Sequence, residues 1–126
     1  PTAIGSEPND ADYDSCPHWT ITMQGHAAAN IMPVMASNRF GFEKGILGTS
    51  ENSYDVTFYG SSFISGPKGE LLEQAGRDEE KILLAEFDLD QIQKLRSGWG
   101  IFRDRRPELY NVLLSIDGSP IISEIQ

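Results

Sequence analysis

Residues 18–42, HWTITMQGHAAANIMPVMASNRFGF, decide the fold of this chain, because they predict a helix that runs directly into a short strand. Pro17 suits the first turn of a helix, where its missing N–H breaks no hydrogen bond, and Asp14 and Ser15 precede it as candidate caps. The apolar residues 32–36 then predict a strand that opens near a proline, where no ladder hydrogen bond is lost.

One face of the predicted helix carries its bulky side chains. The residues at helical spacing on that face are Trp19, Met23, His26, Ala27 and Asn30. The small residues around them allow the helix backbone to approach a sheet closely. We therefore interpret His26 as a hydrogen-bonded histidine of the core.

The strand ends on a polar pair, Asn38 and Arg39. Such a pair has two interpretations. It can clamp a ligand at the strand end, or Asn38 can close a turn while Arg39 pairs with a buried carboxylate, for which Glu43 is the nearest candidate. The second arrangement is the more common one in proteins.

Four further elements are predicted downstream. They are strands within residues 54–65, a strand over residues 82–87, a short helix over residues 91–96 capped by Asp88 or Asp90, and a last short helix from Pro107 to Leu114. Residues 66–69, GPKG, predict a tight turn between two strands. Helices and strands are mixed along the chain, so the predicted class is α/β, of the α+β type.

Composition excludes several classes of function. The 126 residues are 39% hydrophobic and 23% charged, which is ordinary for one globular domain. A net charge of −9 argues against nucleic acid or an anionic membrane as a partner. No apolar run approaches the roughly 20 residues of a membrane span. Cys16 is the only cysteine, so no internal disulfide is possible, and a reducing, cytoplasmic location is expected.

Candidate chemical groups are few. His18 and His26 are eight residues apart, which is poor spacing for a shared metal, and no metal site is expected. The acidic side chains between Glu7 and Asp14 can bind a cation or simply face solvent. Cys16 precedes a helix, whose positive end favours a thiolate, but no base accompanies it. The arginines between residues 103 and 106 are expected to pair with carboxylates rather than to bind polyanions.

Several long segments of this sequence resemble one known family. The resemblance covers nearly the whole chain, from Pro1 to about Gly118. The segments are PTAIGSEP at residues 1–8, HWTITMQGHAAAN at 18–30, PVMASNRFG at 33–41, FYGSSFISGPKGE at 58–70 and WGIFRDRRPELY at 99–110. In this order they are similar to the carboxy-terminal part of the nitrilase superfamily, and within it to the N-carbamoylputrescine amidases.

The resemblance implies half of a four-layer α-β-β-α sandwich, formed by residues 1–118, with residues 119–126 as a tail. The family's catalytic glutamate, lysine and cysteine belong to the portion before Pro1, so no residue of this chain is assigned a catalytic role. The first residue is proline rather than methionine, which fits a piece of a longer protein. The resemblance also implies a homo-oligomer that needs no cofactor.

The resemblance further implies where a substrate is bound. Residues that follow the strand after the family's cysteine line the pocket, and here these are Thr2, Ala3 and Ile4. Glu7 follows closely, and its carboxylate suits the distal ammonium of N-carbamoylputrescine. Two alternatives remain open: another carbon–nitrogen hydrolase, for example one resembling β-ureidopropionase, and a non-catalytic module that oligomerises through its carboxy-terminal segment.

Overall fold

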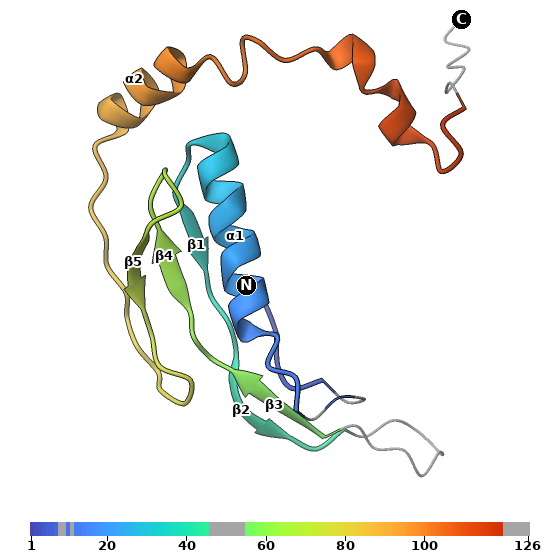
Figure 1. Ribbon diagram of the computed structural model, residues 1–126. Helices are drawn as coiled ribbons and strands as arrows, with labels where there is room; N and C mark the ends of the chain where they lie inside the picture. Colours follow the sequence, from blue (N-terminus) through green and yellow to red (C-terminus); the bar gives the residue numbers. More distant parts are fainter. Residues whose placement is uncertain (8–9, 11, 46–54, 120–126) are drawn as a thin grey trace, which may run out of the picture.

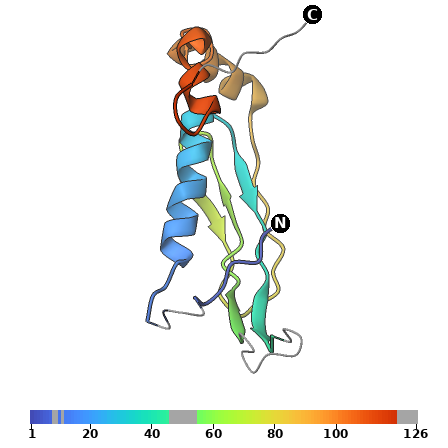
Figure 2. The ribbon, with the colours of Figure 1, turned by 90° about the vertical axis from the view of Figure 1, so that its right-hand side faces the viewer.

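A helix layer covers one face of a small antiparallel sheet in the computed structural model, which describes residues 1–7, 10, 12–45 and 55–119 (Figures 1 and 2). The helix is α1 (Cys16–Asn30), and the sheet has the strand order β1 (Val34–Ala36), β4 (Phe63–Ser65), β5 (Leu71–Gln74). A second pair of antiparallel strands, β2 (Phe40–Glu43) and β3 (Val56–Tyr59), extends the same ribbon beyond the sheet. The mixed α/β class is confirmed, with two of the four layers that the resemblance implies.

The start and end of α1 follow the predicted signals. Pro17 lies in the first turn, and the Asp14 carboxylate accepts a hydrogen bond from the backbone N–H of Cys16 at 3.1 Å, whereas Ser15 makes no side-chain cap. The helix ends at Ile31, which adopts a left-handed conformation with φ of 48°. A β-branched residue rarely takes this conformation, and the burial of Ile31 in the core offsets its cost.

α1 packs on the sheet through a narrow face. Its buried residues are Cys16, Thr20 and Ala27. The rings of Trp19 and Phe63 meet edge to face, with centroids 5.2 Å apart and planes at 70°. Phe63 belongs to the central strand β4 and is almost completely buried, so this contact joins the helix to the middle of the sheet.

The interpretation of His26 as a core residue is wrong, because its side chain is exposed. Its neighbour Ala27 is fully buried, and consecutive helical residues point about 100° apart, so only one of the two can face the sheet. Asn30, from the same predicted face, is also exposed and donates a hydrogen bond to the carbonyl of His26.

The turn between β4 and β5 packs against α1. The Gln24 side chain donates a hydrogen bond to the carbonyl oxygen of Gly69 at 2.7 Å. Gly69 has φ of +83°, and a Cβ there would lie 2.9 Å from the Gln24 carbonyl oxygen. Glycine is therefore required both by the turn and by the close approach to the helix. The predicted tight turn is confirmed.

Three predicted elements differ from the structure in the second half of the chain. Residues 82–87 form no strand; they lead in an extended path from β5 to α2 (Leu89–Trp99), with Ile82 86% exposed and Leu84 80% exposed (Figure 1). Apolar content suggested a strand, but a strand also needs a neighbour to complete its ladder of hydrogen bonds. α2 is longer than the predicted 91–96, and of the two candidate caps Asp88 accepts a hydrogen bond from the Gln91 N–H.

The predicted last helix is replaced by two short 3₁₀ helices, η1 (Pro107–Leu109) and η2 (Asn111–Leu114). Neither buries any of its residues. Short helices depend on tertiary burial, so without it this segment does not propagate into a continuous α-helix. Of the expected tail, residues 120–126 lie outside the described residues. No helix within the described part of the chain is long and apolar enough to cross a membrane.

Asn38 connects three segments of the chain. Its side-chain oxygen accepts hydrogen bonds from the Thr2 hydroxyl at 2.9 Å and from the Ile4 N–H at 2.8 Å. Its side-chain nitrogen donates to the carbonyls of Ile4 at 3.0 Å and Gly60 at 2.9 Å. The amide therefore uses both acceptor positions and both donors. It fixes the first residues of the chain against the ends of β1 and β3.

We expect Asn38→Ala to destabilise the complete protein by about 2–4 kcal/mol, because half-buried backbone groups lose their partners. Thermal unfolding followed by circular dichroism measures this. Asn30→Ala is the matched control, since Asn30 is exposed and makes one hydrogen bond within α1. Equal destabilisation by the two variants would contradict the role given to Asn38.

Candidate functional site

The four residues expected to bind substrate lie on one extended segment at the start of the chain. Thr2 bridges to Asn38, and Gly5 bridges to Phe58 on β3, so the segment runs between the end of β1 and β3. Thr2 and Ile4 are half-buried, and Ala3 is exposed. The segment is continuous, and backbone hydrogen bonds hold it to Ser37, Arg39, Thr57 and Tyr59.

The hydroxyl group of Thr2 contacts other parts of the chain and is not free. The hydroxyl lies 2.9 Å from the Asn38 side-chain oxygen and 3.1 Å from the Ser37 carbonyl oxygen. The Ile4 N–H and carbonyl are both bound to Asn38, and the carbonyl also accepts from the Tyr59 N–H at 3.0 Å. Thr2 and Ile4 can therefore contribute shape to a site, but their polar groups are already used.

Glu7 is the one ionisable group among the four. Its side chain is half-buried, and its carbonyl accepts a hydrogen bond from the Asp10 N–H at 3.3 Å. Within the described residues its carboxylate forms no ion pair and no side-chain hydrogen bond. A fixed backbone and an unpaired carboxylate suit the binding of a cationic group.

The Asn38–Arg39 pair is structural. Because the amide of Asn38 is saturated, it has no capacity left for a ligand. Arg39 forms an ion pair with Glu43, as the second interpretation predicted, and its guanidinium lies 4.9 Å from the centre of the Phe58 ring. Both carboxylate and guanidinium are substantially exposed, so the pair adds little to stability.

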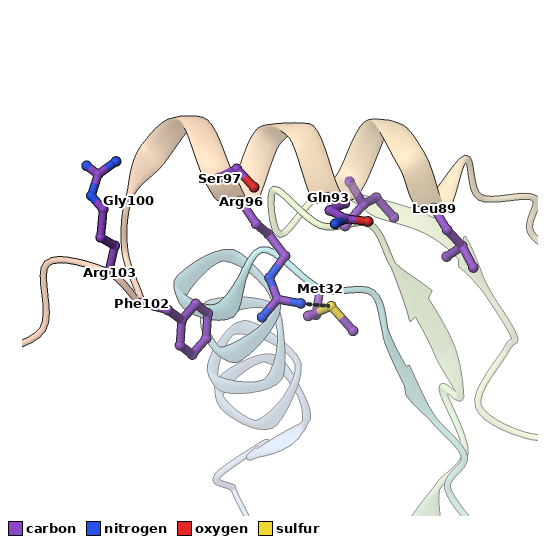
Figure 3. Close-up of a pocket in the computed structure, with 9 residues that line it drawn as sticks. Met32, Leu89, Gln93, Arg96, Ser97, Gly100, Phe102 and Arg103 are labelled. Carbon is purple, nitrogen blue, oxygen red and sulfur yellow. Dashed lines mark hydrogen bonds between the residues drawn. The ribbon is translucent and has the colours of Figure 1, made fainter.

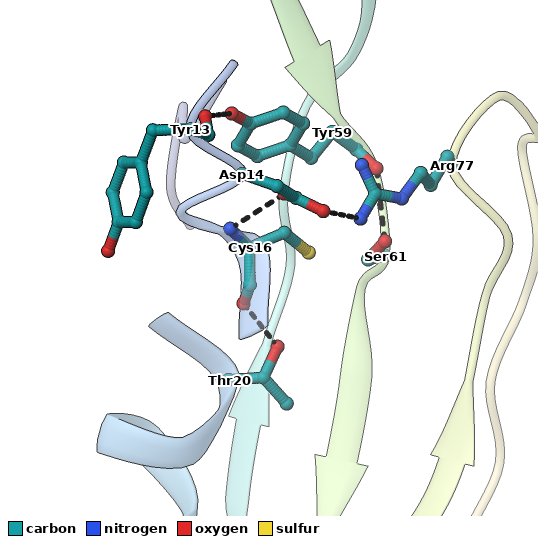
Figure 4. Close-up of polar contacts among 7 residues, drawn as sticks. All are labelled: Tyr13, Asp14, Cys16, Thr20, Tyr59, Ser61 and Arg77. Carbon is teal, nitrogen blue, oxygen red and sulfur yellow. Dashed lines mark hydrogen bonds and ion pairs between the residues drawn. The ribbon is translucent and has the colours of Figure 1, made fainter. Parts of the chain in front are cut away.

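A second polar cluster joins the loop before α1 to the loop after β5 (Figure 4). Asp14 accepts a hydrogen bond from Arg77 at 2.6 Å, and the Arg77 guanidinium lies 5.2 Å from the centre of the Tyr59 ring. The Tyr59 hydroxyl donates to the Tyr13 carbonyl at 3.5 Å. The hydrogen bond from Arg77 is the main cause that lowers the pKa of Asp14, and the same bond raises the pKa of Arg77.

Sequence reasoning missed this cluster. Asp14 and Arg77 are 63 positions apart, and no periodic pattern links a loop carboxylate to a loop arginine at that distance. The Asp14 carboxylate both caps α1 and neutralises the charge of Arg77. The cluster is therefore a latch between two loops.

Cys16 belongs to this latch and not to a catalytic pair. The residue is buried and borders a groove lined also by Ser61, Gln74 and Arg77. The Asp14 carboxylate accepts a hydrogen bond from the Cys16 N–H at the start of α1. Glu43 is paired with Arg39, so it is not available as a base beside Cys16. In the described part of the chain no three His, Cys, Asp or Glu side chains are grouped to hold a metal ion.

The described residues do not bring a nucleophile together with a base. The Asn38 amide holds Thr2 and Ile4 in place, and the Glu7 carboxylate at the end of that segment pairs with no described residue. Chemistry at this site would need groups that the described residues do not bring together.

Comparisons with known proteins identify the family of this chain. The family model described as carbon-nitrogen hydrolase matches residues 9–97. An N-carbamoylputrescine amidase of Solanum tuberosum is 58% identical over 119 residues, which is 94% of this chain and 39% of that protein. A citrullinase of Francisella tularensis is 50% identical over 114 residues, which is 90% of this chain and 38% of that protein. The chain thus spans about 39% of the length of the first of these relatives.

A solved structure shares the fold. The crystal structure of a carbon-nitrogen hydrolase from Helicobacter pylori G27 superposes with a TM-score of 0.76 at 39% sequence identity. The superposition covers 92% of this chain and 40% of that one.

We expect acid to weaken the Asp14–Arg77 latch. The pKa of Asp14 is lowered in the folded state, so its contribution is complete above the unfolded pKa, near 4, and is lost as pH falls through the folded value. Asp14→Asn should reduce the free energy of unfolding by less than about 1 kcal/mol at pH 7, because both groups are half-exposed. The difference from the unmodified protein should become smaller as the pH falls below about 4.

Urea unfolding at pH 7, 4 and 2 tests this, with Asp12→Asn as the control from the same loop. A deficit of Asp14→Asn that persists unchanged at pH 2 would show that the latch does not depend on the charge of Asp14.

Proposed function

Because this chain belongs to the carbon–nitrogen hydrolase family, we propose that it is part of an enzyme that hydrolyses N-carbamoylputrescine to putrescine, carbon dioxide and ammonia. The observation that carries the proposal is the 58% identity with an N-carbamoylputrescine amidase over 94% of the chain. Since the chain spans only part of that relative, the activity is proposed for the complete protein.

The chemistry proposed for the complete protein is covalent catalysis. A cysteine thiolate attacks the ureido carbon, a glutamate acts as base, and a lysine with backbone N–H groups stabilises the developing oxyanion. Ammonia leaves as the acyl-enzyme forms. Water then hydrolyses the acyl-enzyme to a carbamic acid, which loses carbon dioxide and releases putrescine. The resemblance assigns these three residues to the portion before Pro1.

The role proposed for this chain is to bind the end of the substrate remote from the reacting carbon. Thr2, Ala3 and Ile4 would line the pocket, and Glu7 would bind the distal ammonium of the carbamoylated diamine. The support is that Glu7 is half-buried, lies on a fixed segment and is unpaired among the described residues. A carboxylate facing an amine selects against substrates that end in a carboxylate.

A second candidate substrate is citrulline, favoured by the 50% identity with a citrullinase. Citrulline carries the same ureido group, but its far end bears a carboxylate beside the ammonium. The two substrates therefore make different demands on the residues around Glu7: citrulline also needs a donor for its carboxylate, while N-carbamoylputrescine needs only an anion.

We further propose that the complete protein is a cytoplasmic homo-oligomer that acts in polyamine biosynthesis. The free thiol of Cys16 fits a reducing compartment. The exposed apolar side chains of the segment after α2 fit contacts between subunits.

We expect residues 1–126 alone to show no amidase activity, because the nucleophile lies elsewhere. The purified chain incubated with N-carbamoylputrescine should release no ammonia above a blank. Ammonia release that disappears in Cys16→Ser would overturn the assignment of Cys16 to the latch.

In the complete protein, we expect Glu7→Gln to lower kcat/KM for N-carbamoylputrescine about ten- to a hundred-fold. A hydrogen bond to a charged group contributes about 1.5–3 kcal/mol, and each 1.4 kcal/mol is about tenfold. The loss should fall mainly on KM, because the ammonium is remote from the bond that breaks. Steady-state assays of ammonia release measure both constants.

The control substrate is an uncharged analogue with the same ureido group, which both forms should hydrolyse about equally. Equal losses for the charged and uncharged substrates would remove Glu7 from the binding site. Citrulline is assayed in parallel, and a higher kcat/KM for citrulline than for N-carbamoylputrescine would favour the second candidate.

A further inference from the structure

The hydroxyl group of Ser6 ends the pairing of the first segment of the chain with β3. The bridge between Gly5 and Phe58 is antiparallel, so Ser6 stands opposite Thr57. The Ser6 N–H donates a hydrogen bond to the Thr57 carbonyl oxygen at 2.9 Å, as in a regular ladder. The Thr57 N–H donates to the Ser6 side-chain oxygen at 3.0 Å, where a regular ladder would use the Ser6 carbonyl oxygen. A side chain thus replaces the backbone as the acceptor, one residue before Glu7.

Gly5 allows the segment to approach β3 closely. A Cβ at this position would lie 2.7 Å from the Thr57 carbonyl oxygen and 2.7 Å from a methyl carbon of Val56. Both distances are too short for a carbon atom, so a larger residue would push the segment away from β3. The close approach brings the short side chain of Ser6 within hydrogen-bonding distance of the Thr57 N–H.

The chain changes direction directly after Ser6. The Glu7 carbonyl oxygen accepts a hydrogen bond from the Asp10 N–H at 3.3 Å, so Glu7 opens a turn. If the Thr57 N–H used the Ser6 carbonyl oxygen instead, the ladder would continue, and the peptide between Ser6 and Glu7 would rotate toward β3. Side-chain direction in an extended segment follows the backbone, so this rotation would redirect the Glu7 side chain. The Ser6 hydroxyl therefore sets the direction in which Glu7 leaves the sheet.

The cavity beside α2 does not suit the cationic end of the proposed substrate (Figure 3). Its volume is about 560 Å³, and the charged side chains that border it are Arg96 and Arg103. Positive charges repel an ammonium group, so this cavity offers it no partner. The Glu7 carboxylate is half-buried and unpaired among the described residues, so it is the better partner, and its direction matters for binding.

We propose that Ser6 is a positioning residue for the cationic end of the substrate: its hydroxyl, held by the Thr57 N–H, directs the Glu7 carboxylate toward the ammonium. This inference rests on the proposed function of Glu7 and deepens it. The segment has two separate anchors, because Asn38 holds Ile4 and Thr57 holds Ser6. Loss of the Ser6 hydroxyl should therefore weaken selection for a cation and leave the binding of the ureido group intact.

Steady-state kinetics of the complete protein test this assignment. Ser6→Ala should raise KM for N-carbamoylputrescine about three- to tenfold, as expected for one neutral hydrogen bond, with kcat changed less than about twofold. KM for an uncharged analogue with the same ureido group should stay the same. Ser6→Thr keeps the hydroxyl and is the matched control, with KM within about twofold of the unmodified protein. Equal increases in KM for the two variants, or for the two substrates, would contradict the assignment.

A double-mutant cycle distinguishes action through Glu7 from a separate structural effect. Once Glu7→Gln has removed the charge, Ser6→Ala should raise KM by less than about a further twofold. Fully additive losses would overturn the inference. The unfolding temperature of Ser6→Ala should stay close to that of the unmodified protein, because the Thr57 N–H can pair with the carbonyl of residue 6. A lowered unfolding temperature with unchanged KM values would leave Ser6 a structural role alone.

A crystal structure of the complete Ser6→Ala protein tests the geometry without an assay. The Thr57 N–H should donate to the carbonyl oxygen of residue 6, and the Glu7 carboxylate should be displaced. A carboxylate in its original place would reject the inference. Failure of the proposed function gives different results: the unmodified protein would not hydrolyse N-carbamoylputrescine, or Glu7→Gln would leave its KM unchanged. A normal loss in Glu7→Gln without any loss in Ser6→Ala rejects the role of Ser6 and leaves the proposed function intact.

Discussion

The side-chain amide of Asn38 is the interaction on which the rest of this structure depends. Its four hydrogen bonds hold the first residues of the chain against the exits of β1 and β3. The backbone of Asn38 is also tied to the hydroxyl of Ser62, just before the central strand β4. An asparagine amide has two donors and two acceptor positions, and here all four are satisfied by one chain. The position of Glu7 depends on these bonds and on the hydrogen bonds between Ser6 and Thr57, which hold the same segment.

Much of the fold could be predicted from local signals. Pro17 and the small residues of α1 indicated a helix against a sheet, and the GPKG turn indicated the hairpin of β4 and β5. The pairing of Arg39 with Glu43 was also predictable, since the two residues are four positions apart. Each of these features depends on residues that are close to one another in the sequence. The long sequence segments that resemble the family also indicated the family itself and the candidate site residues.

The features that could not be predicted depend on distant partners. The contact of Arg77 with Asp14 and the saturation of the Asn38 amide become visible only when loops are placed in space. His26 was misassigned because helical spacing defines a face but does not say which edge of it meets the sheet. Residues 82–87 were misassigned for a related reason: apolar content indicates burial or pairing, and only the neighbours decide whether a ladder forms.

The contact of Gln24 with Gly69 has a consequence for the order in which the chain folds. The two residues are 45 positions apart, so the entropy of closing that loop must be overcome before the contact stabilises anything. The hairpin of β4 and β5 closes over only a few residues and can form in microseconds. α1 lacks a strong apolar stripe and gains its stability from this hairpin and from Phe63. The short loop of the hairpin and the long loop closed by the Gln24–Gly69 contact favour formation of the hairpin before α1 docks on it.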